Sequence, residues 1–594
     1  MHVPTEPSPS RGDLQRTNEA VANGEAVGQV DGVAREVPGE RREDHISIVV
    51  HGAHRTHVDV SAGRCPLSSP PVSDYDAIVI GAGHNGLTAA FVMARGGMRV
   101  LCFEKNHFIG GMASNTELIR GYRFELAGSI QFPIPDQIFE DLDLASCPIY
   151  EPEVMSASLG AAGEPPLLLY TDPEKLLPHL TETIGLEGAL GMAEIAAWAE
   201  APARAIGRFD VRQPPKSLDD MWASAANEAE REAIRTALFG SVMDVVDRFL
   251  PDKERHAQVR SMLAFLAVNS TYRGPYTPGS AMCLAFALAS PNGATMSKVE
   301  GGIGTISEHI LASLEKHGGE LRRHVKVANI VVADGRVEGV ALADGDVITA
   351  PVVVSNLDPT ATFTQLLDRD DLPPEFARRV DAIDHRAAYY QVHFALNGLP
   401  EYRSPYEILN EGDVAHNVTF FGTAEEMQRD YEGCLAGVVP AAPSFNIQIP
   451  SRRDPDLAPP GKHAASTFAF YFPIGATRAE QTKLSEEMAD RIVAKITAAA
   501  PNFPDLIDRQ LNYPAYTYEL MFGCTGGDFT HGLLQPEFMG PFRPGPRGWA
   551  DQPIPIEGLY LCGAGCHGGP GVTFIPGYNC GYAVLDTAGD TARL

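Results

Sequence analysis

The chain has 594 residues, of which 44% are hydrophobic and 21% charged, a composition ordinary for a soluble globular protein with two or more domains. Its formal net charge of −29 at pH 7 argues against a nucleic-acid partner, because phosphate backbones attract an excess of Lys and Arg. No run reaches the roughly 18 consecutive apolar residues that a membrane-spanning helix needs. We therefore expect a cytoplasmic protein with no transmembrane segment, and we leave peripheral membrane contact open.

The first 73 residues are polar and show little hydrophobic periodicity. A segment with so few apolar residues cannot bury enough surface to offset the entropy of ordering it. We predict that residues 1–73 are a disordered N-terminal extension or a gene-model artefact, and that ordered structure begins at Tyr75.

A βαβ unit is predicted at the start of the ordered chain. Residues 77–80 form a short apolar run that ends in glycines, residues 87–95 are small and apolar, and the run "RVLCFE" at 99–104 is typical of a second buried strand. The order strand, glycine turn, helix, strand is the frame in which a dinucleotide-binding motif is expected.

Gly81, Gly83 and Gly86 form the motif G-x-G-x-x-G in this frame. The first glycine permits the tight turn, the second lets the backbone approach a pyrophosphate, and the third allows close packing of helix on strand. The start of the helix then offers free amides and a partial positive charge to the phosphates. Glu104 ends the second strand, where a carboxylate suits a ribose diol and repels a 2′-phosphate.

Two further glycine-rich segments favour FAD over NAD. Gly110 and Gly111 follow soon after Glu104, as in flavoproteins of the glutathione-reductase type. Near the C-terminus a predicted strand is followed by "GAGCHGGPGV" at 563–572 and then a helix. Amides around Gly571 and Val572 could stabilise negative charge on a reduced isoalloxazine. Two glycine-rich segments at opposite ends of the chain suit a long cofactor, so we predict FAD.

The remaining chain alternates helical and strand patterns. Residues 151–270 are predicted to be mostly helical, and residues 304–319 form an amphipathic helix closed by two glycines. Asp334-Gly335 and Asp344-Gly345 separate alternating apolar segments, which predicts two hairpin turns.

The quoted segments, together with "FEKNHFIGGMAS", "VEGGIGTISEHI", "GGDFTHG" and "LYLCGAGCHGGPGVT", resemble the phytoene dehydrogenase-related flavoproteins. The likeness is greatest to the pyridine nucleotide-disulfide oxidoreductase domain-containing protein 2 group, with bacterial carotene-ketolase-like relatives. The resemblance spans residues 75–590 and implies an FAD-dependent oxidoreductase. It implies an α/β fold, with a glutathione-reductase-like Rossmann domain for FAD and a second α+β domain that shapes the substrate pocket. No vicinal dithiol is present, so we expect no disulfide reductase activity.

The resemblance also implies a division of the chain and a set of cofactor contacts. The FAD-binding domain is expected to consist of residues 74–150, 291–360 and 546–594, and the substrate domain of a mostly helical segment at 151–290 and a sheet-containing segment at 361–545. The predicted cofactor-binding residues are Gly81, Gly83, His84, Asn85, Gly86, Glu104, Lys105, Gly110, Gly111, Met112, Ala113, Val327, Gly563, Gly571 and Val572. Val327 is expected to contact adenine through its backbone.

Two departures from the family pattern concern the flavin contacts. Many relatives carry an Arg soon after the Gly-Gly pair, whereas Met112 and Ala113 stand here, so phosphate charge must be met by amides or elsewhere. The usual "HPGGGV" reads "HGGPGV" in this chain, and Pro570 removes one backbone donor.

Flavin supplies redox chemistry, so the protein's task is orientation and electrostatics. His567, in the loop expected beside the isoalloxazine, is the first candidate for a proton acceptor, and His531 in "GGDFTHG" is the second. For each, a structural histidine in a glycine-rich turn is the alternative. His393 lies on an apolar strand that could form the floor of the pocket, but a core histidine is favoured. No His/Cys/Asp cluster has metal-ligand spacing, so no metal is expected.

The leading hypothesis is an FAD-dependent enzyme that desaturates, saturates or isomerises C–C bonds of a hydrophobic, isoprenoid or carotenoid-like small molecule. One alternative is a non-catalytic escort protein on the same fold, against which the intact glycine motif and Glu104 speak. Another is an FAD amine oxidase, for which Tyr578 is the single hint of an aromatic cage.

Overall fold

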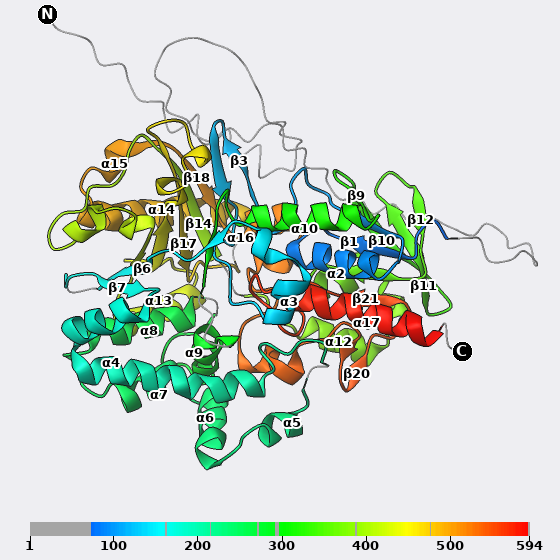
Figure 1. Cartoon of the computed structure of the whole chain (residues 1–594), viewed down its shortest axis with the longest axis horizontal. Helices are drawn as coiled ribbons and strands as arrows, with labels where there is room; N and C mark the ends of the chain where they lie inside the picture. Colours follow the sequence, from blue (N-terminus) through cyan, green and yellow to red (C-terminus); the bar gives the residue numbers. More distant parts are fainter. Residues whose placement is uncertain are drawn as a thin grey trace, which may run out of the picture.

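The computed structural model describes residues 73–591, apart from 161–162, 214–215, 270–271, 292–295, 387–388 and 476. The predicted N-terminal extension therefore lies, but for its last residue, outside the described residues. Figure 1 shows three parts: a parallel sheet with its helices on the right, a larger sheet at the upper left and a helical region at the lower left. Within the described residues, no helix has the length and apolarity to cross a membrane.

The parallel sheet has five strands and is built from three distant segments of the chain. In spatial order its strands are β21 (Leu559–Leu561), β13 (Val353–Ser355), β1 (Ala77–Ile80), β2 (Val100–Phe103) and β9 (Glu320–Arg322). All four pairings are parallel. The predicted βαβ unit is confirmed, with α2 (His84–Arg95) as its crossover. Because β1 has β2 on one side and β13 on the other, the strand order reverses at its carboxyl end, where such sheets bind ligands.

Both faces of this sheet are covered, as a parallel sheet requires. Ala77 and Val79 of β1 face a core shared with α2, α10 (Gly304–Lys316) and α17 (Ile575–Thr591). Ile78 and Ile80 face the opposite core. That second core is shared with β10 (Val327–Ala333), β11 (Arg336–Leu342), α11 (Pro359–Gln365) and α12 (Pro374–Asp381).

Two of these elements bear on the predicted domain boundary at residue 360. Phe363 of α11 and Phe376 of α12 pack edge-to-face, with ring centroids 4.9 Å apart, in the core beneath the parallel sheet. A helix packs where its apolar face is buried, and these two helices bury theirs against the half that contains the parallel sheet. We therefore infer that this half extends to Asp381.

The larger sheet has seven strands. In spatial order they are β18 (Ile507–Tyr513), β14 (Tyr389–Leu396), β17 (His463–Phe470), β16 (Phe445–Gln448), β15 (Asn417–Phe420), β6 (Val154–Leu159) and β7 (Leu167–Tyr170). The β15–β6 pair is parallel and the other pairs are antiparallel. On β14, alternate residues such as Tyr390, Val392 and Phe394 pack against α14 (Arg478–Ala499).

The prediction that residues 151–270 are mostly helical is wrong for its first part. β6 and β7 lie there, at the edge of the seven-stranded sheet. Their local sequence shows no clear alternation, and β6 becomes a strand by pairing with β15, more than 250 residues away in the chain. Tertiary pairing of this kind overrides local propensity.

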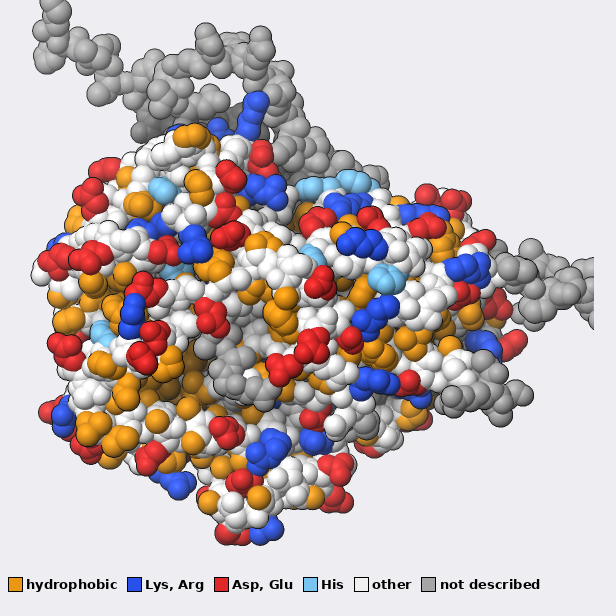
Figure 2. All heavy atoms as spheres, viewed as in Figure 1, with side chains coloured by type: hydrophobic (Ala, Val, Ile, Leu, Met, Phe, Trp, Pro, Cys, Tyr) orange, Lys and Arg blue, Asp and Glu red, His pale blue; other side chains and the backbone are white. Residues whose placement is uncertain are grey.

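The helical region is built around α9 (Ser280–Leu288), whose residues 280–286 are all buried. The helices around it are α4 (Pro173–Ala205), α6 (Glu228–Phe239), α7 (Val242–Phe249) and α8 (Ala257–Val268). Figure 2 shows hydrophobic side chains on the visible face of this region. Leu177, Leu186 and Leu190 of α4 are each more than half exposed.

The short-range predictions are confirmed where turn chemistry decides the structure. β10 and β11 form a hairpin across Asp334 and Gly335, both with positive φ, and β12 (Val347–Thr349) follows after Gly345 at φ +100°. Helix α10 ends just before Gly318, whose φ is +80°.

Candidate functional site

The predicted glycine turn joins β1 to α2 with the expected geometry. Gly81 has φ +94°, which favours glycine, and its N–H donates to Phe103 O at 2.8 Å. A Cβ on Gly86 would lie 2.1 Å from the carbonyl oxygen of Gly81, so the first turn of α2 fits against the strand only with glycine there.

The second glycine pair lies directly against this turn. Gly83 and Gly110 form a parallel bridge, and Gly110 N–H donates to Ala82 O at 2.8 Å. Gly110 and Gly111 have φ of +96° and +62°. A Cβ on Gly111 would meet the Cα of Gly83 at 3.3 Å. Two stretches of bare backbone therefore form one cradle at the carboxyl end of β1, which we call the glycine cradle (residues 81–86 and 110–111).

Glu104 closes the glycine cradle at the end of β2. Its side chain is buried, with 7% of the residue exposed, and its two carboxylate oxygens accept hydrogen bonds from Ala82 N–H at 3.0 Å and Asn106 N–H at 2.9 Å. Burial raises the pKa of this carboxyl group, while the two backbone donors lower it. Glu104 thereby holds the end of β2 against the glycine turn.

Other predicted residues near Glu104 make structural contacts. Lys105 Nζ donates to Leu520 O at 3.0 Å, so this ammonium group turns toward the end of α16 (Ala515–Phe522). Val325 N–H donates to Glu104 O at 2.9 Å, which brings the chain before Val327 beside the acid. Val327 itself is buried and pairs with Leu342 in the hairpin.

Asn356 is a site residue that the sequence analysis missed. It follows β13, and its Nδ2 donates to Gly81 O at 3.2 Å. A Cβ on Gly83 would lie 2.6 Å from this Nδ2, so the bare backbone of Gly83 already accommodates the Asn356 amide. A dinucleotide at the glycine cradle must lie beside that amide or displace it. The signal was present, because polar residues that follow a buried parallel strand lie at the ligand-binding edge of the sheet.

The C-terminal loop (residues 563–574) packs against the glycine cradle. Asn85 Oδ1 accepts a hydrogen bond from Gly577 N–H at 3.3 Å, and His84 contacts Phe574 edge-to-face with ring centroids 5.6 Å apart. The His84 ring also lies close to the backbones of Gly110 and Gly571, and its burial lowers its pKa to about 4. The two glycine-rich ends of the chain are therefore adjacent in space.

The other predicted cofactor-binding residues near the C-terminal loop lie where two segments of backbone are in close contact. A Cβ on Gly563 would lie 2.7 Å from Leu357 O, and Gly571, with φ +111°, lies next to Phe132. Val572 O accepts a short hydrogen bond from Gln131 Nε2. Ala113 N–H donates to Gly110 O at 3.1 Å, which closes the second glycine segment.

The two candidate histidines come from different segments, His567 from the C-terminal loop and His531 from the segment before it, and they face different neighbours. His567 is 4% exposed, and its ring faces the backbone of Gly207 with no hydrogen-bond partner for Nε2. Burial lowers its pKa to about 4, so it is neutral at pH 7. His531 has φ +55° and no partner for Nδ1, and it lies near His84 on the side of the glycine cradle.

His393 belongs to the core, as favoured above. It is fully buried, its Nδ1 lies 2.8 Å from Ser466 Oγ, and burial lowers its pKa to about 3. On the same face of β14, Tyr389 stacks on Phe529 with ring centroids 4.2 Å apart. Tyr389 belongs to an aromatic cluster on this face of the seven-stranded sheet. The aromatic cluster consists of Ala127, Tyr389, Phe468, Tyr518, Cys524, Met112, Tyr513, Phe522 and Phe529.

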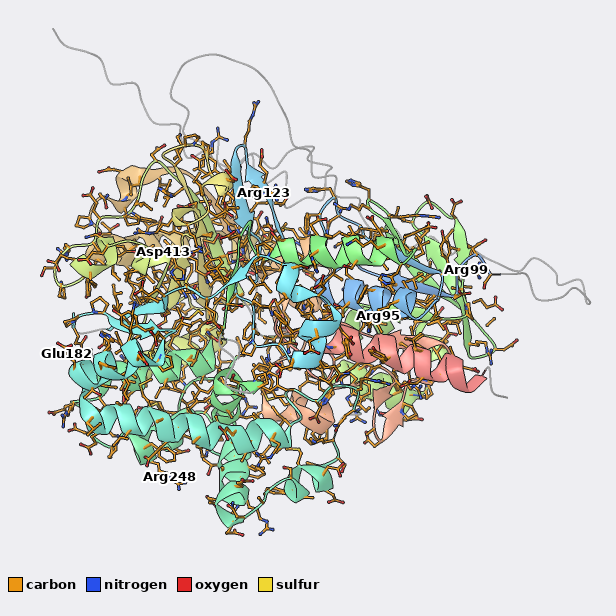
Figure 3. All side chains as sticks on the ribbon, in the orientation of Figure 1. Arg95, Arg99, Arg123, Glu182, Arg248 and Asp413 are labelled. Atoms are coloured by element: carbon orange, nitrogen blue, oxygen red, sulfur yellow. The ribbon has the colours of Figure 1, made fainter. Side chains whose placement is uncertain are left out.

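Tyr578 does not face the C-terminal loop. Its hydroxyl donates to Asp141, which also forms an ion pair with Arg95 of α2 at 3.0 Å. Figure 3 marks Arg95 on that side of the molecule. The single sequence hint of an amine-oxidase cage is therefore a contact between α17 and the last residue of α3 (Asp136–Asp141). In the described ranges, no three His, Cys, Asp or Glu residues are grouped to hold a metal.

Residues 79–143 match the family described as NAD(P)-binding Rossmann-like domain. The chain is 29% identical over 553 residues to rat (Rattus norvegicus) pyridine nucleotide-disulfide oxidoreductase domain-containing protein 2, covering 86% of this chain and 93% of the relative. It is 22% identical to the chloroplastic prolycopene isomerase of Daucus carota, covering 87% and 81%. A structure of putrescine oxidase bound to putrescine has the same fold, with a TM-score of 0.54, 15% identity and coverage of 87% and 99%.

These comparisons bear on the predicted fold and class. The fold is mixed α/β with a Rossmann-like domain, as expected, and it is shared with a flavin amine oxidase. The prediction of an enzyme of the oxidoreductase class is confirmed by the relatives. The resemblance drawn from the motifs is confirmed as well: over most of its length, the chain is similar to the pyridine nucleotide-disulfide oxidoreductase domain-containing protein 2 group.

Proposed function

We propose that the protein is an FAD-dependent oxidoreductase that desaturates, saturates or isomerises C–C bonds of a hydrophobic, isoprenoid-type substrate. The observation that carries the proposal is the meeting of the glycine cradle and the C-terminal loop at the point where the strand order reverses. Bare backbone and a buried carboxylate at one end, with a glycine-rich loop at the other, fit an extended dinucleotide.

In this proposal the glycine cradle holds the pyrophosphate through backbone N–H groups, and Glu104 holds a ribose. The acid can do so because burial keeps its carboxylate close to the glycine turn, where it already accepts two N–H groups. FAD, when bound, supplies hydride acceptance and donation. Residues 567–572 of the C-terminal loop would lie beside its reactive end.

The chain's own residues supply proton handling and exclusion of water. His567 is neutral at pH 7 with an unpaired Nε2, so it can accept a proton released from an adjacent carbon. The aromatic cluster brings Tyr389 and Phe529 together with Met112, which follows the glycine cradle in the chain. An apolar wall there favours a hydrocarbon substrate and keeps bulk water from the reacting atoms.

The cofactor is tested by purifying the protein and recording its absorbance spectrum, then adding FAD or NAD to any apoprotein while following thermal unfolding. Bound or acquired flavin, with a higher unfolding temperature in FAD than in NAD, is expected. Folded, colourless protein that takes up no FAD would overturn the proposal and favour an escort protein.

The substrate class is tested separately on the flavin-loaded protein. Anaerobic mixing with an acyclic polyene is expected to bleach the flavin or to change the double-bond pattern of the polyene, as read by chromatography and mass spectrometry. Peroxide release with putrescine, without any reaction of polyenes, would favour an amine oxidase instead.

A further inference from the structure

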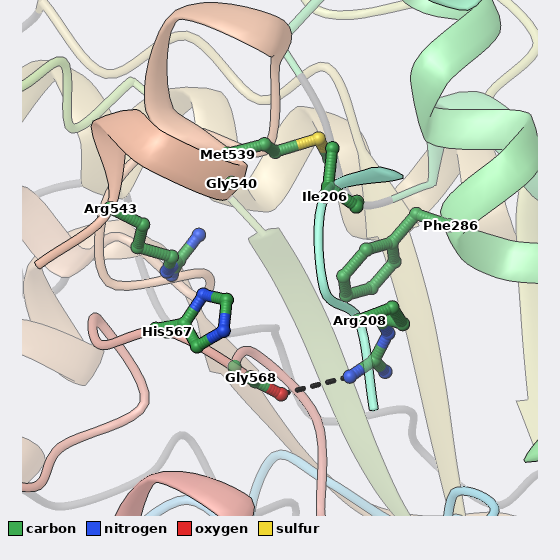
Figure 4. Close-up of a pocket in the computed structure, with 9 residues that line it drawn as sticks. Ile206, Arg208, Phe286, Met539, Gly540, Arg543, His567 and Gly568 are labelled. Carbon is green, nitrogen blue, oxygen red and sulfur yellow. Dashed lines mark hydrogen bonds between the residues drawn. The ribbon is translucent and has the colours of Figure 1, made fainter. Parts of the chain in front are cut away.

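A small pocket lies between the helical region and the C-terminal loop. It is lined by Ile206 at the end of α4, Arg208 just after it, Phe286 of α9, Met539, Arg543 and His567. Figure 4 shows Arg208 and Arg543 on opposite sides of His567, with all three side chains turned toward the same space. Two guanidinium groups and an imidazole therefore share one pocket with three apolar side chains.

Arg208 is a buried cation with a free donor. Only 3% of the residue is exposed, its Nη1 donates to Gly568 O at 2.9 Å, and its guanidinium lies 3.9 Å from the ring centroid of Phe286. Its Nε has no hydrogen-bond partner. Burial and the nearby Arg543 lower its pKa to about 9, which still leaves it charged at pH 7.

Arg543 is buried in the same way. It is 2% exposed and donates through Nη2 to Thr530 O at 2.8 Å and Ala564 O at 2.9 Å, while its Nε is unpaired. Burial lowers its pKa to about 10, so it too is charged at pH 7. Across the described ranges, neither arginine forms an ion pair with a carboxylate.

The acids near the pocket are already occupied. Asp528 accepts hydrogen bonds from Thr530 and Gly532, and it lies 3.0 Å from His385 Nδ1. Asp210, the acid near His567, forms an ion pair with Lys216 at 3.1 Å. The charge of Asp528 still raises the pKa of Arg543, but neither guanidinium group has a carboxylate as a hydrogen-bond partner among the described residues.

Buried charges and buried donors without partners are costly, and proteins normally pair them. Here two such nitrogen atoms, Nε of Arg208 and Nε of Arg543, belong to residues that line one pocket. An oxyanion fits this set, because guanidinium groups bind carboxylates through charge-assisted hydrogen bonds. Ile206, Phe286 and Met539 form the apolar part of the lining.

We propose that this pocket binds the carboxylate of an amphipathic substrate, with Arg208 and Arg543 as its ligands and the apolar body leaving the pocket beside Phe286 and Met539. The inference rests on the proposed function, since it names the head group of the hydrophobic substrate expected at the C-terminal loop. The same charges would repel an ammonium group, which disfavours an amine as substrate.

The experiment is calorimetric titration of the flavin-loaded protein with dodecanoate and, separately, with dodecanol, which shares the chain but lacks the charge. We expect dodecanoate to bind at least tenfold more tightly, a difference of about 1.4 kcal/mol. Equal affinities would overturn the inference whatever the variants do. Acetate or inorganic phosphate binding as tightly as dodecanoate would also overturn it, because the apolar body would then contribute nothing.

Variants locate the site. Arg208→Gln keeps an N–H group for the Gly568 carbonyl but removes the charge, and it is expected to weaken dodecanoate binding at least tenfold while leaving dodecanol within twofold. Arg248→Met is the matched control: Arg248 also lies over a phenylalanine, Phe249, but it is exposed on α7 and points outward in Figure 3. Unchanged dodecanoate binding in folded Arg208→Gln, or equal losses in both variants, would contradict the assignment. Absence of flavin would instead refute the proposed function, and the absorbance spectrum reports the presence of flavin independently of these titrations.

Discussion

The packing of α17 on α2 makes a prediction that can be worked from single atoms. A Cβ on Gly577 would lie 2.1 Å from Asn85 O, about 1.3 Å closer than an ordinary contact of 3.4 Å, and the obstacle is backbone that cannot rotate away. Helix α17 must therefore shift, and with it the C-terminal loop that precedes it. Overpacking of this kind costs typically 1–3 kcal/mol, which exceeds the roughly 1 kcal/mol that Ala gains over Gly in a helix.

The same helix offers graded controls. Gly589→Ala meets nothing within 4 Å and should stabilise the protein by up to about 1 kcal/mol. Gly581→Ala meets the Val92 side chain at 2.6 Å, so it should fall between the two. Thermal and urea unfolding measure the free energies, and fluorescence titration measures FAD affinity. We expect Gly577→Ala to be the least stable and to bind FAD at least tenfold more weakly. If its stability and FAD affinity match those of Gly589→Ala, the coupling between α17 and the glycine cradle is refuted.

Three further predictions follow from buried polar groups. Glu104→Gln should lower FAD affinity about tenfold or more and cost about 1–3 kcal/mol of stability, because a side-chain amide has one oxygen and cannot accept from both backbone N–H groups. Unchanged FAD titration and unfolding curves would count against this role of Glu104. The His385 pKa is raised above 6.5 chiefly by its bond to Asp528, so the stability from that pair should be complete below pH 6.5 and decline as pH rises through the folded value. Asp528 has a lowered pKa, so its contribution to stability should be present above about pH 4 and lost in acid. The free energy of unfolding in urea, measured across pH, should therefore fall on both the acid and the alkaline side. His385→Gln should remove the fall on the alkaline side. Tyr578→Phe should cost roughly 1–3 kcal/mol by removing the bond to Asp141, with no change in turnover, and a large fall in turnover would restore the aromatic-cage hypothesis.

The sequence alone was sufficient for the features that depend on neighbouring residues. The βαβ unit, the hairpin at Asp334-Gly335 and the end of α10 follow from turn chemistry and apolar periodicity, which act over a few residues. The motif residues Gly81, Gly86 and Glu104 were found for the same reason, since each has a local geometric task.

Only the tertiary structure decided the features that depend on distant pairing. β6 and β7 are strands because β15 offers a partner, and Asn356 enters the glycine cradle because β13 lies beside β1. Arg208, Arg543 and His567, each with an unpaired nitrogen atom, meet in one pocket for the same reason, although they come from separate segments of the chain. Local sequence encodes turns and amphipathic faces, whereas the burial of a charge or the filling of a cradle depends on which distant surfaces meet when the core closes.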